Sequence, residues 1–152
     1  MTNKKVAVLV VVFLASYSVF YALGSRLVWA ASESVEPTVF WKTNQKPVVH
    51  EYVWFPCNHP KLTRPIKSCI KVLRCNEGQL LKTVEAKYWC DDEVLGEARI
   101  TDMKGFPLKQ YRFSGSIPDG KAFVMGESHN SFDSRYLGLI ETSKMTRLSP
   151  IL

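Results

Sequence analysis

The stretch VAVLVVVFLASYSVFYALGS, from Val6 to Ser25, decides the architecture that the sequence predicts. These twenty residues carry no charge, and an α-helix of about 20 apolar residues crosses a hydrocarbon layer about 30 Å thick. Lys4 and Lys5 precede the run, and Arg26 follows it. Because positively charged flanks remain preferentially in the cytoplasm, the sequence predicts a cytoplasmic N-terminus (residues 1–5), a transmembrane anchor (residues 6–25) and an exported remainder.

A cleaved signal peptide is the alternative interpretation of this run. The apolar core of a signal peptide spans about 7–15 residues, which is shorter than the run here. Val28, Trp29 and Ala30 still form a tolerable small-residue cleavage site. We therefore expect a retained anchor and leave its cleavage open.

The remaining residues, 26–152, suffice for one domain with its own core. Residues 26–31 are expected to form a short link beside the membrane. Six later segments have the β-branched, aromatic or alternating apolar character that is typical of strands: Glu51 to Phe55, Ser68 to Arg74, Leu80 to Trp89, Glu93 to Ile100, Gln110 to Phe113 and Ala122 to Met125. Glycine and proline separate them, and beyond the anchor only a turn near residues 133–139 looks helical. The predicted fold class is mainly β, behind one N-terminal transmembrane helix.

The charge of the chain bears on its partners. The formal net charge is +6, and two of the positive residues lie before the anchor. No basic block stands out, and aromatic residues are not interleaved with one, so we do not expect nucleic acid as a partner. A modest positive excess suits a domain that lies beside anionic membrane lipid.

Four cysteines lie in the part predicted to be exported: Cys57, Cys69, Cys75 and Cys90. Disulfides are favoured outside the cytoplasm, and four cysteines allow three connectivities, which the sequence leaves open. A metal site that includes His50 or His59 is the alternative, but no two of the cysteines have the spacing typical of zinc ligands. We expect structural disulfides and no metal or other cofactor.

The segment SESVEPT, residues 32–38, carries the candidate nucleophile. Pro37 fixes its own φ and disfavours helix in the residue before it, so a rigid extended turn is expected. Such a turn holds the hydroxyl of Ser34 and nearby backbone N–H groups in place. On an extended chain Ser32 shares a face with Ser34, where its hydroxyl would serve as a second oxyanion donor.

The candidate base is Lys71, which lies between Ile70 and the apolar pair Val72 and Leu73. Burial lowers the pKa of a lysine from about 10.4 towards neutrality, because desolvation penalises the charged amine. A neutral amine accepts the proton of a serine and later returns it to a leaving group. A solvated lysine on an edge strand is the ordinary alternative.

A third segment supplies supporting groups. Asp133 and Arg135 share a face of an extended chain and are expected to form an ion pair that locks the loop. Ser131 is expected to form a hydrogen bond with the amine of Lys71 and to orient it. His129 raises the alternative of a Ser–His–Asp triad, which we do not favour.

These three segments resemble, in the same order, the motifs of the type I (leader) signal peptidases. SESVEPT resembles their S-G-S-M-x-P-T motif, and IKVL (residues 70–73) with Gly78 resembles V-K-R-V-x-G-x-P-G-D. FVMGESHNSFDSRYLG (residues 123–138) resembles F-V-M-G-D-N-R-x-N-S-x-D-S-R-x-x-G. The chain departs from these motifs at a few places, which bear on fine specificity: Val35 for methionine, Cys75, Glu77 and Gln79 for Gly, Pro and Asp, and one residue fewer around His129.

The resemblance implies a signal-peptidase-like β domain and a role for each candidate residue. It implies Ser34 as nucleophile, Lys71 as general base, Ser32 as oxyanion donor and Ser131 as the residue that orients the lysine. It implies further that Asp133 and Arg135 hold the site together, and the conjugative branch assigns the matching aspartate a catalytic part.

The small size, the single anchor and the SFDSRYLG ending are most similar to the TraF-like peptidases of conjugative transfer, which mature pilin subunits. The resemblance therefore implies a serine endopeptidase in the bacterial inner membrane, with its catalytic domain in the periplasm. Its substrates would be exported precursor polypeptides, either pilins or other preproteins, cleaved after small residues. Hydrolysis and cyclisation of the pilin both remain open. A general housekeeping signal peptidase and a catalytically silent assembly factor of a secretion or pilus apparatus are the alternatives.

Overall fold

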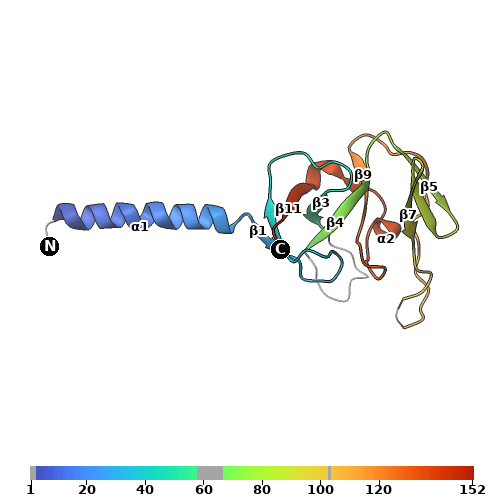
Figure 1. The fold of residues 1–152 in the computed structure, drawn as a ribbon, viewed down its shortest axis with the longest axis horizontal. Helices are drawn as coiled ribbons and strands as arrows, with labels where there is room; N and C mark the ends of the chain where they lie inside the picture. Colours follow the sequence, from blue (N-terminus) through green and yellow to red (C-terminus); the bar gives the residue numbers. More distant parts are fainter. Residues whose placement is uncertain (1–2, 58–66, 103) are drawn as a thin grey trace.

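The computed structural model describes residues 3–57, 67–102 and 104–152. It begins with helix α1 (Asn3–Gly24), which is solvent-exposed along its length and projects from a β-rich part (Figure 1). By length and composition, Lys4–Gly24 is able to cross a membrane. This agrees with the anchor that the sequence predicts.

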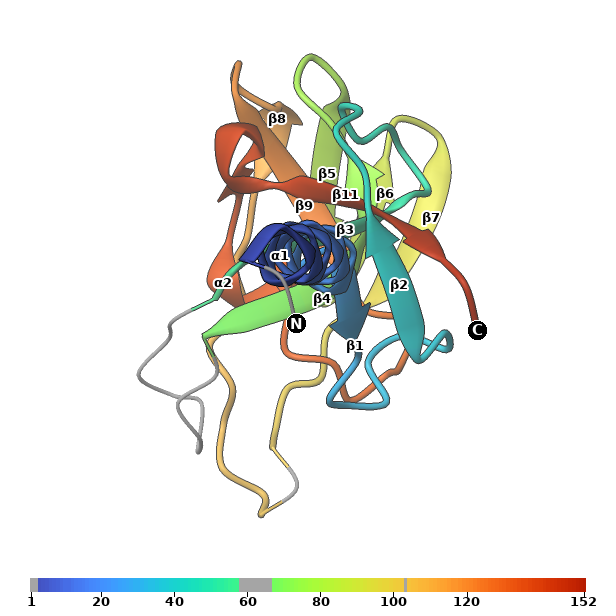
Figure 2. The ribbon, with the colours of Figure 1, turned by 90° about the vertical axis from the view of Figure 1, so that its left-hand side faces the viewer.

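The β-rich part contains a seven-stranded sheet in which neighbouring strands are antiparallel. Its order is β1 (Leu27–Trp29), β2 (Val39–Lys42), β11 (Thr146–Pro150), β3 (Tyr52–Pro56), β4 (Ser68–Cys75), β9 (Lys121–Met125) and β10 (Ile140–Glu141). The expected link at residues 26–31 is therefore wrong in part, because Leu27–Trp29 pairs with Val39–Lys42. Figure 2 shows this sheet from the side of α1.

A second sheet has four strands, in the order β7 (Glu93–Glu97), β6 (Lys87–Cys90), β5 (Leu80–Val84) and β8 (Ser114–Ser116). The expected single strand from Leu80 to Trp89 is a hairpin, and the chain reverses at Glu85, whose φ is 54°. The strand expected at Gln110 to Phe113 is also wrong. The backbone of this segment does not pair with any described strand; instead, the N–H of Tyr111 donates a hydrogen bond to the carbonyl of Arg135 (2.7 Å).

The two sheets share a core. Tyr88 of β6 stacks on Phe123 of β9, with ring centroids 5.3 Å apart, and both side chains are fully buried. A disulfide joins Cys75 at the end of β4 to Cys90 at the end of β6, so the sheets are also linked covalently. The mainly β class is confirmed.

The second disulfide joins Cys57 to Cys69, next to the paired strands β3 and β4. The structure thus selects one of the three connectivities. Because all four cysteines form disulfides, no thiolate is free to bind a metal, and the alternative metal site is wrong. His50 instead lies 3.5 Å from a carboxylate oxygen of Glu93, and His59 lies outside the described residues.

Candidate active site

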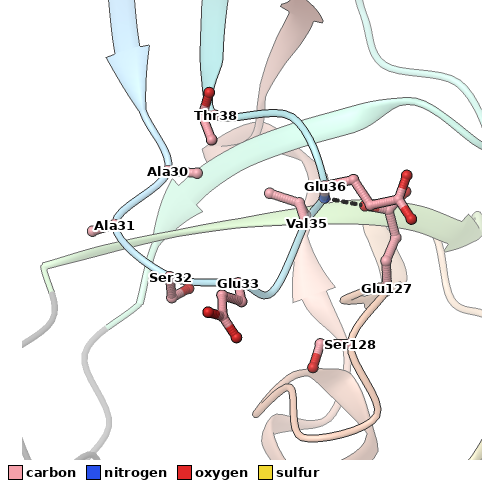
Figure 3. A pocket seen from close by; sticks show the side chains of 9 residues that line it. All are labelled: Ala30, Ala31, Ser32, Glu33, Val35, Glu36, Thr38, Glu127 and Ser128. Atoms are coloured by element: carbon pink, nitrogen blue, oxygen red, sulfur yellow. Dashed lines mark hydrogen bonds between the residues drawn. The ribbon is translucent and has the colours of Figure 1, made fainter. Parts of the chain in front are cut away.

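Ser34 lies in a turn between β1 and β2. Figure 3 shows the neighbouring residues Ser32, Glu33 and Val35 of this turn close to Glu127 and Ser128, in the loop that follows β9. Its carbonyl oxygen accepts hydrogen bonds from the N–H groups of Glu127 (2.8 Å) and Ser128 (3.4 Å). The next residue, Val35, is buried against Phe40 and Leu148. Backbone bonds on one side and an apolar side chain on the other therefore fix the turn that presents Ser34.

The side chain of Glu127 also forms hydrogen bonds that fix the turn of Ser34. One carboxylate oxygen accepts from the N–H of Glu36 (2.7 Å), and the other accepts from the hydroxyl of Tyr52 (2.8 Å). Figure 3 shows the first of these bonds, and both Glu36 and Glu127 line a pocket of about 620 Å³. Burial of Tyr52, together with the hydrogen bond from its hydroxyl to Glu127, raises the pKa of Tyr52 to about 12. The carboxylate of Glu127 thus ties the turn of Ser34 to β3.

The hydroxyl of Ser32 donates to the hydroxyl oxygen of Ser34 over 3.0 Å. The segment is a turn rather than an extended strand, yet it still brings the two hydroxyls together. Ser32 is exposed, whereas Ser34 is half-buried.

Lys71 lies in the middle of β4, opposite Val53 of β3, and only 4 % of it is exposed. Burial lowers its pKa to about 8, the nearby Asp133 opposes that change, and Arg135 adds to it. Among the described residues no carboxylate lies within 4 Å of the amine. The ordinary alternative of a solvated edge lysine is therefore wrong, since β4 lies between β3 and β9.

One cavity brings the candidate pair together. Ser32, Ser34 and Lys71 all line a cavity of about 480 Å³, which we call the reactive cavity. Its other walls include Val28, which lies in β1, and Ala30, which directly follows β1. Residues 28–34 and Lys71 belong to segments that are far apart in sequence, so the fold and not local spacing creates this arrangement.

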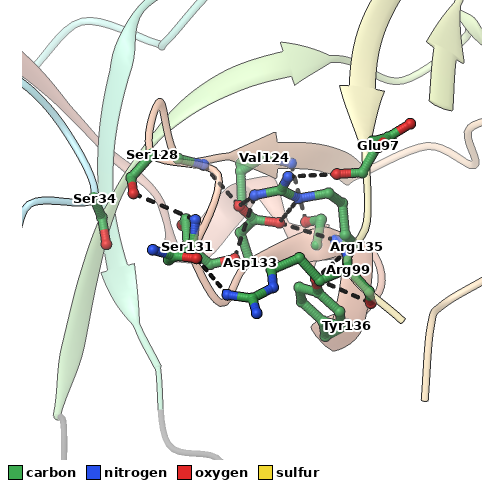
Figure 4. Close-up of polar contacts among 12 residues, drawn as sticks. Ser34, Glu97, Arg99, Val124, Ser128, Ser131, Asp133, Arg135 and Tyr136 are labelled. Carbon is green, nitrogen blue, oxygen red and sulfur yellow. Dashed lines mark hydrogen bonds and ion pairs between the residues drawn. The ribbon is translucent and has the colours of Figure 1, made fainter. Parts of the chain in front are cut away.

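Asp133 and Arg135 form a buried ion pair (Figure 4). The guanidinium donates to both carboxylate oxygens, through Nε (2.8 Å) and Nη2 (2.7 Å). Asp133 also accepts from the N–H of Gly126 (2.8 Å), and Arg135 donates to the carbonyl of Glu97 (2.8 Å). The pair therefore connects the 126–133 loop to β7, and the expected ion pair is confirmed.

Ser131 is 3 % exposed and packs directly against Gly126. A Cβ at Gly126 would overlap the side chain of Ser131 and come within 2.8 Å of the carbonyl oxygen of Ser34, so only glycine fits there. The hydroxyl of Ser131 has no hydrogen-bond partner among the described residues. The hydrogen bond that we expected between Ser131 and Lys71 is therefore not formed in this structure.

His129 does not complete a triad in the described part of the chain. It is exposed, and it does not line the reactive cavity. Asp133, the aspartate that such a triad would need, is directed at Arg135 and Gly126 instead.

Comparison with known proteins identifies the family of this chain. Residues 2–148 match the family described as "Signal peptidase, peptidase S26". The chain belongs to the signal peptidase family. As a signal peptidase it is a serine peptidase that acts on precursor polypeptides. No curated protein matches it.

Among solved structures, a signal peptidase I of Enterococcus faecalis V583 is similar to this peptidase. The two share 19 % sequence identity with a TM-score of 0.42, over 72 % of this chain and 99 % of the other.

The sequence missed several residues that support the site. Tyr52 and Glu127 form their bond across 75 positions of the chain, so nothing local indicates it. Ser134, beside the predicted Asp133, accepts from the N–H of Val124 (3.0 Å) and is fully buried. A serine next to a charged pair gives no sign of that role.

Proposed function

We propose that this signal peptidase uses Ser34 as its nucleophile and Lys71 as its general base. The observation that carries the proposal is that both residues line one cavity, where burial holds the pKa of Lys71 near 8. At that pKa a substantial fraction of the amine is neutral at ordinary pH and able to take a proton. A serine becomes an effective nucleophile only when such a base is present.

The reaction would proceed through an acyl-enzyme on Ser34. As the hydroxyl attacks the scissile carbonyl, Lys71 takes its proton and then gives it to the departing amine. Ser32 would turn its hydroxyl from Ser34 Oγ to the developing oxyanion, beside the backbone N–H of Ser34. The unpaired hydroxyl of Ser131 would orient Lys71, and Asp133 with Arg135 would keep the loop in place.

The precursor would bind as an extended chain. β1 is an edge strand of the seven-stranded sheet, and its Val28 and Trp29 line the reactive cavity. An edge strand offers unpaired backbone groups to a peptide, while neighbouring pockets distinguish alternate side chains. The small side chains of Ala30 and Ala31 on the same wall suit cleavage after small residues.

We place the enzyme in the bacterial inner membrane, with α1 as a single-pass anchor, residues 1–5 in the cytoplasm and residues 26–152 in the periplasm. Lys4 and Lys5 before α1 support this orientation. The motif resemblance supports a dedicated pilin peptidase of conjugative transfer over a general housekeeping enzyme. A silent assembly factor would need neither the serine nor a buried lysine.

The test is to express the chain with a candidate pilin precursor and to follow the mass of the precursor. Wild type should convert it, whereas Ser34→Ala and Lys71→Ala should not. Hydrolysis leaves two fragments, and cyclisation leaves a retained product one water lighter than its linear form. Normal processing by both variants would refute the proposed pair, and a wild type that processes ordinary preproteins but no pilin would favour the housekeeping enzyme.

A further inference from the structure

A second cavity, of about 540 Å³, adjoins the reactive cavity. Asn130 and Phe132 line both cavities and form the wall between them. A peptide bound beside Ser34 therefore reaches the second cavity once it extends past these two residues. Arg99 and Lys104 also line it, and we call it the basic cavity. Figure 4 shows the guanidinium of Arg99 directed towards the loop of Ser128 and Ser131, on the side where Ser34 lies.

The cations of the basic cavity have no anionic partner in the described part of the chain. Neither Arg99 nor Lys104 forms an ion pair there. The acidic residue on the lining, Asp102, is engaged by its own loop, because one carboxylate oxygen accepts from the N–H groups of Lys104 (2.8 Å) and Phe106 (2.9 Å). Positive charge therefore prevails beside the reactive cavity.

Arg99 is also held in place. Its Nη1 donates to the side-chain oxygen of Asn130 (2.5 Å), and its backbone N–H donates to the hydroxyl of Tyr136 (2.8 Å). Leu108 and Phe132 add apolar walls. An arginine that is already positioned loses little freedom on binding, and its planar head suits a carboxylate better than an ammonium does.

We propose that the basic cavity is a specificity subsite in which Arg99 binds a carboxylate of the precursor, close in sequence to the scissile bond. The carboxylate belongs either to an aspartate or glutamate side chain or to the C-terminus of the precursor. This inference rests on the proposed function, since it takes Ser34 as the point of cleavage. It adds a charge requirement to the small-residue preference.

The test uses the full-length chain in detergent micelles and internally quenched alanine-rich peptides. One glutamate, or one glutamine in the matched peptide, is moved along the peptide one position at a time, and each peptide is made as free acid and as amide. At one position, the wild-type kcat/KM should be about tenfold higher for the glutamate peptide, the effect of one partly solvated charge-assisted bond. Arg99→Gln should bring the ratio close to one, and Arg99→Glu should favour a lysine at that position.

Arg112→Glu is the matched control, because Arg112 is an exposed arginine that lines neither cavity; it should keep the wild-type ratio. A preference for the free acid over the amide identifies the C-terminal carboxylate, whereas a preference for glutamate over glutamine that amidation spares identifies a side chain. The subsite would be overturned, with the proposed function left standing, if wild type distinguished neither glutamate from glutamine nor free acid from amide, or if the Arg99 variants lost activity equally on all these peptides. If wild type cleaved no peptide and no precursor, the proposed function itself would fail.

Discussion

The amine of Lys71 is buried in the middle of a sheet, and burial brings its pKa down to about 8. If this amine is the base, only its neutral form is active. We therefore expect kcat/KM to rise with pH and to level off above about 8. Lys71→Arg should be inactive throughout, because a guanidinium does not lose its proton in this range. A rate that is flat between pH 6 and pH 9 would contradict the assignment.

The same burial costs stability. A pKa lowered from 10.5 to about 8 corresponds to about 3 kcal/mol. The unfolded chain binds more protons than the folded chain between these two pH values, so stability rises with pH across that interval. We expect Lys71→Met to raise the free energy of unfolding by about 3 kcal/mol at pH 7 and by progressively less as the pH rises from 8 to 10.5. Chemical denaturation at several pH values measures this, and a destabilised Lys71→Met would show that the lysine is not desolvated.

At the scale of single residues, the sequence was informative where chemistry is local. Apolar neighbours correctly predicted the burial of Lys71. No such pattern predicted Glu127, whose partners Glu36 and Tyr52 lie 91 and 75 positions away. The expected bond between Ser131 and Lys71 also failed, since side-chain geometry depends on the packing of Gly126 against the loop.

The loop between β9 and α2 (Ser134–Leu137) depends on one ion pair. Removing one partner of a buried pair leaves the other charge uncompensated, which costs about 3–5 kcal/mol. We therefore expect Asp133→Asn to lower the free energy of unfolding by that amount, with Arg135 left buried. Glu141→Gln is the control: its ion pairs with Lys121 and Lys144 are exposed, and their loss should cost less than about 1 kcal/mol. Equal effects in thermal unfolding would contradict the structural importance of the buried pair.

At the scale of elements, strands with clear β-branched or aromatic content were predicted well, among them β3, β4 and β9. Strands β1, β2 and β8 were missed, because segments of three or four residues carry too little pattern; β1 is the clearest case. The hairpin of β5 and β6 was interpreted as one strand since its turn, at Glu85 and Ala86, contains neither glycine nor proline.

At the scale of the whole molecule, the disulfide between Cys75 and Cys90 joins the two sheets, whereas Cys57 and Cys69 join strands that already pair. Replacing both Cys75 and Cys90 by serine should lower the free energy of unfolding by about 3 kcal/mol, given the 15-residue separation. It should also loosen the contact between the sheets, which hydrogen exchange at β6 would reveal. The matched double replacement of Cys57 and Cys69 should leave exchange at β6 unchanged; the opposite pattern would contradict the role of the first disulfide as a link between sheets.

The position of β11 has a consequence for biosynthesis. Thr146–Pro150 lies between β2 and β3, and its Leu148 supports Val35, the neighbour of Ser34. A nascent chain that has not yet passed Pro150 therefore lacks an inner strand of the larger sheet and the apolar support beneath the turn of Ser34. We expect the turn of Ser34 to reach its final position only after this segment has inserted between two strands that were synthesised earlier.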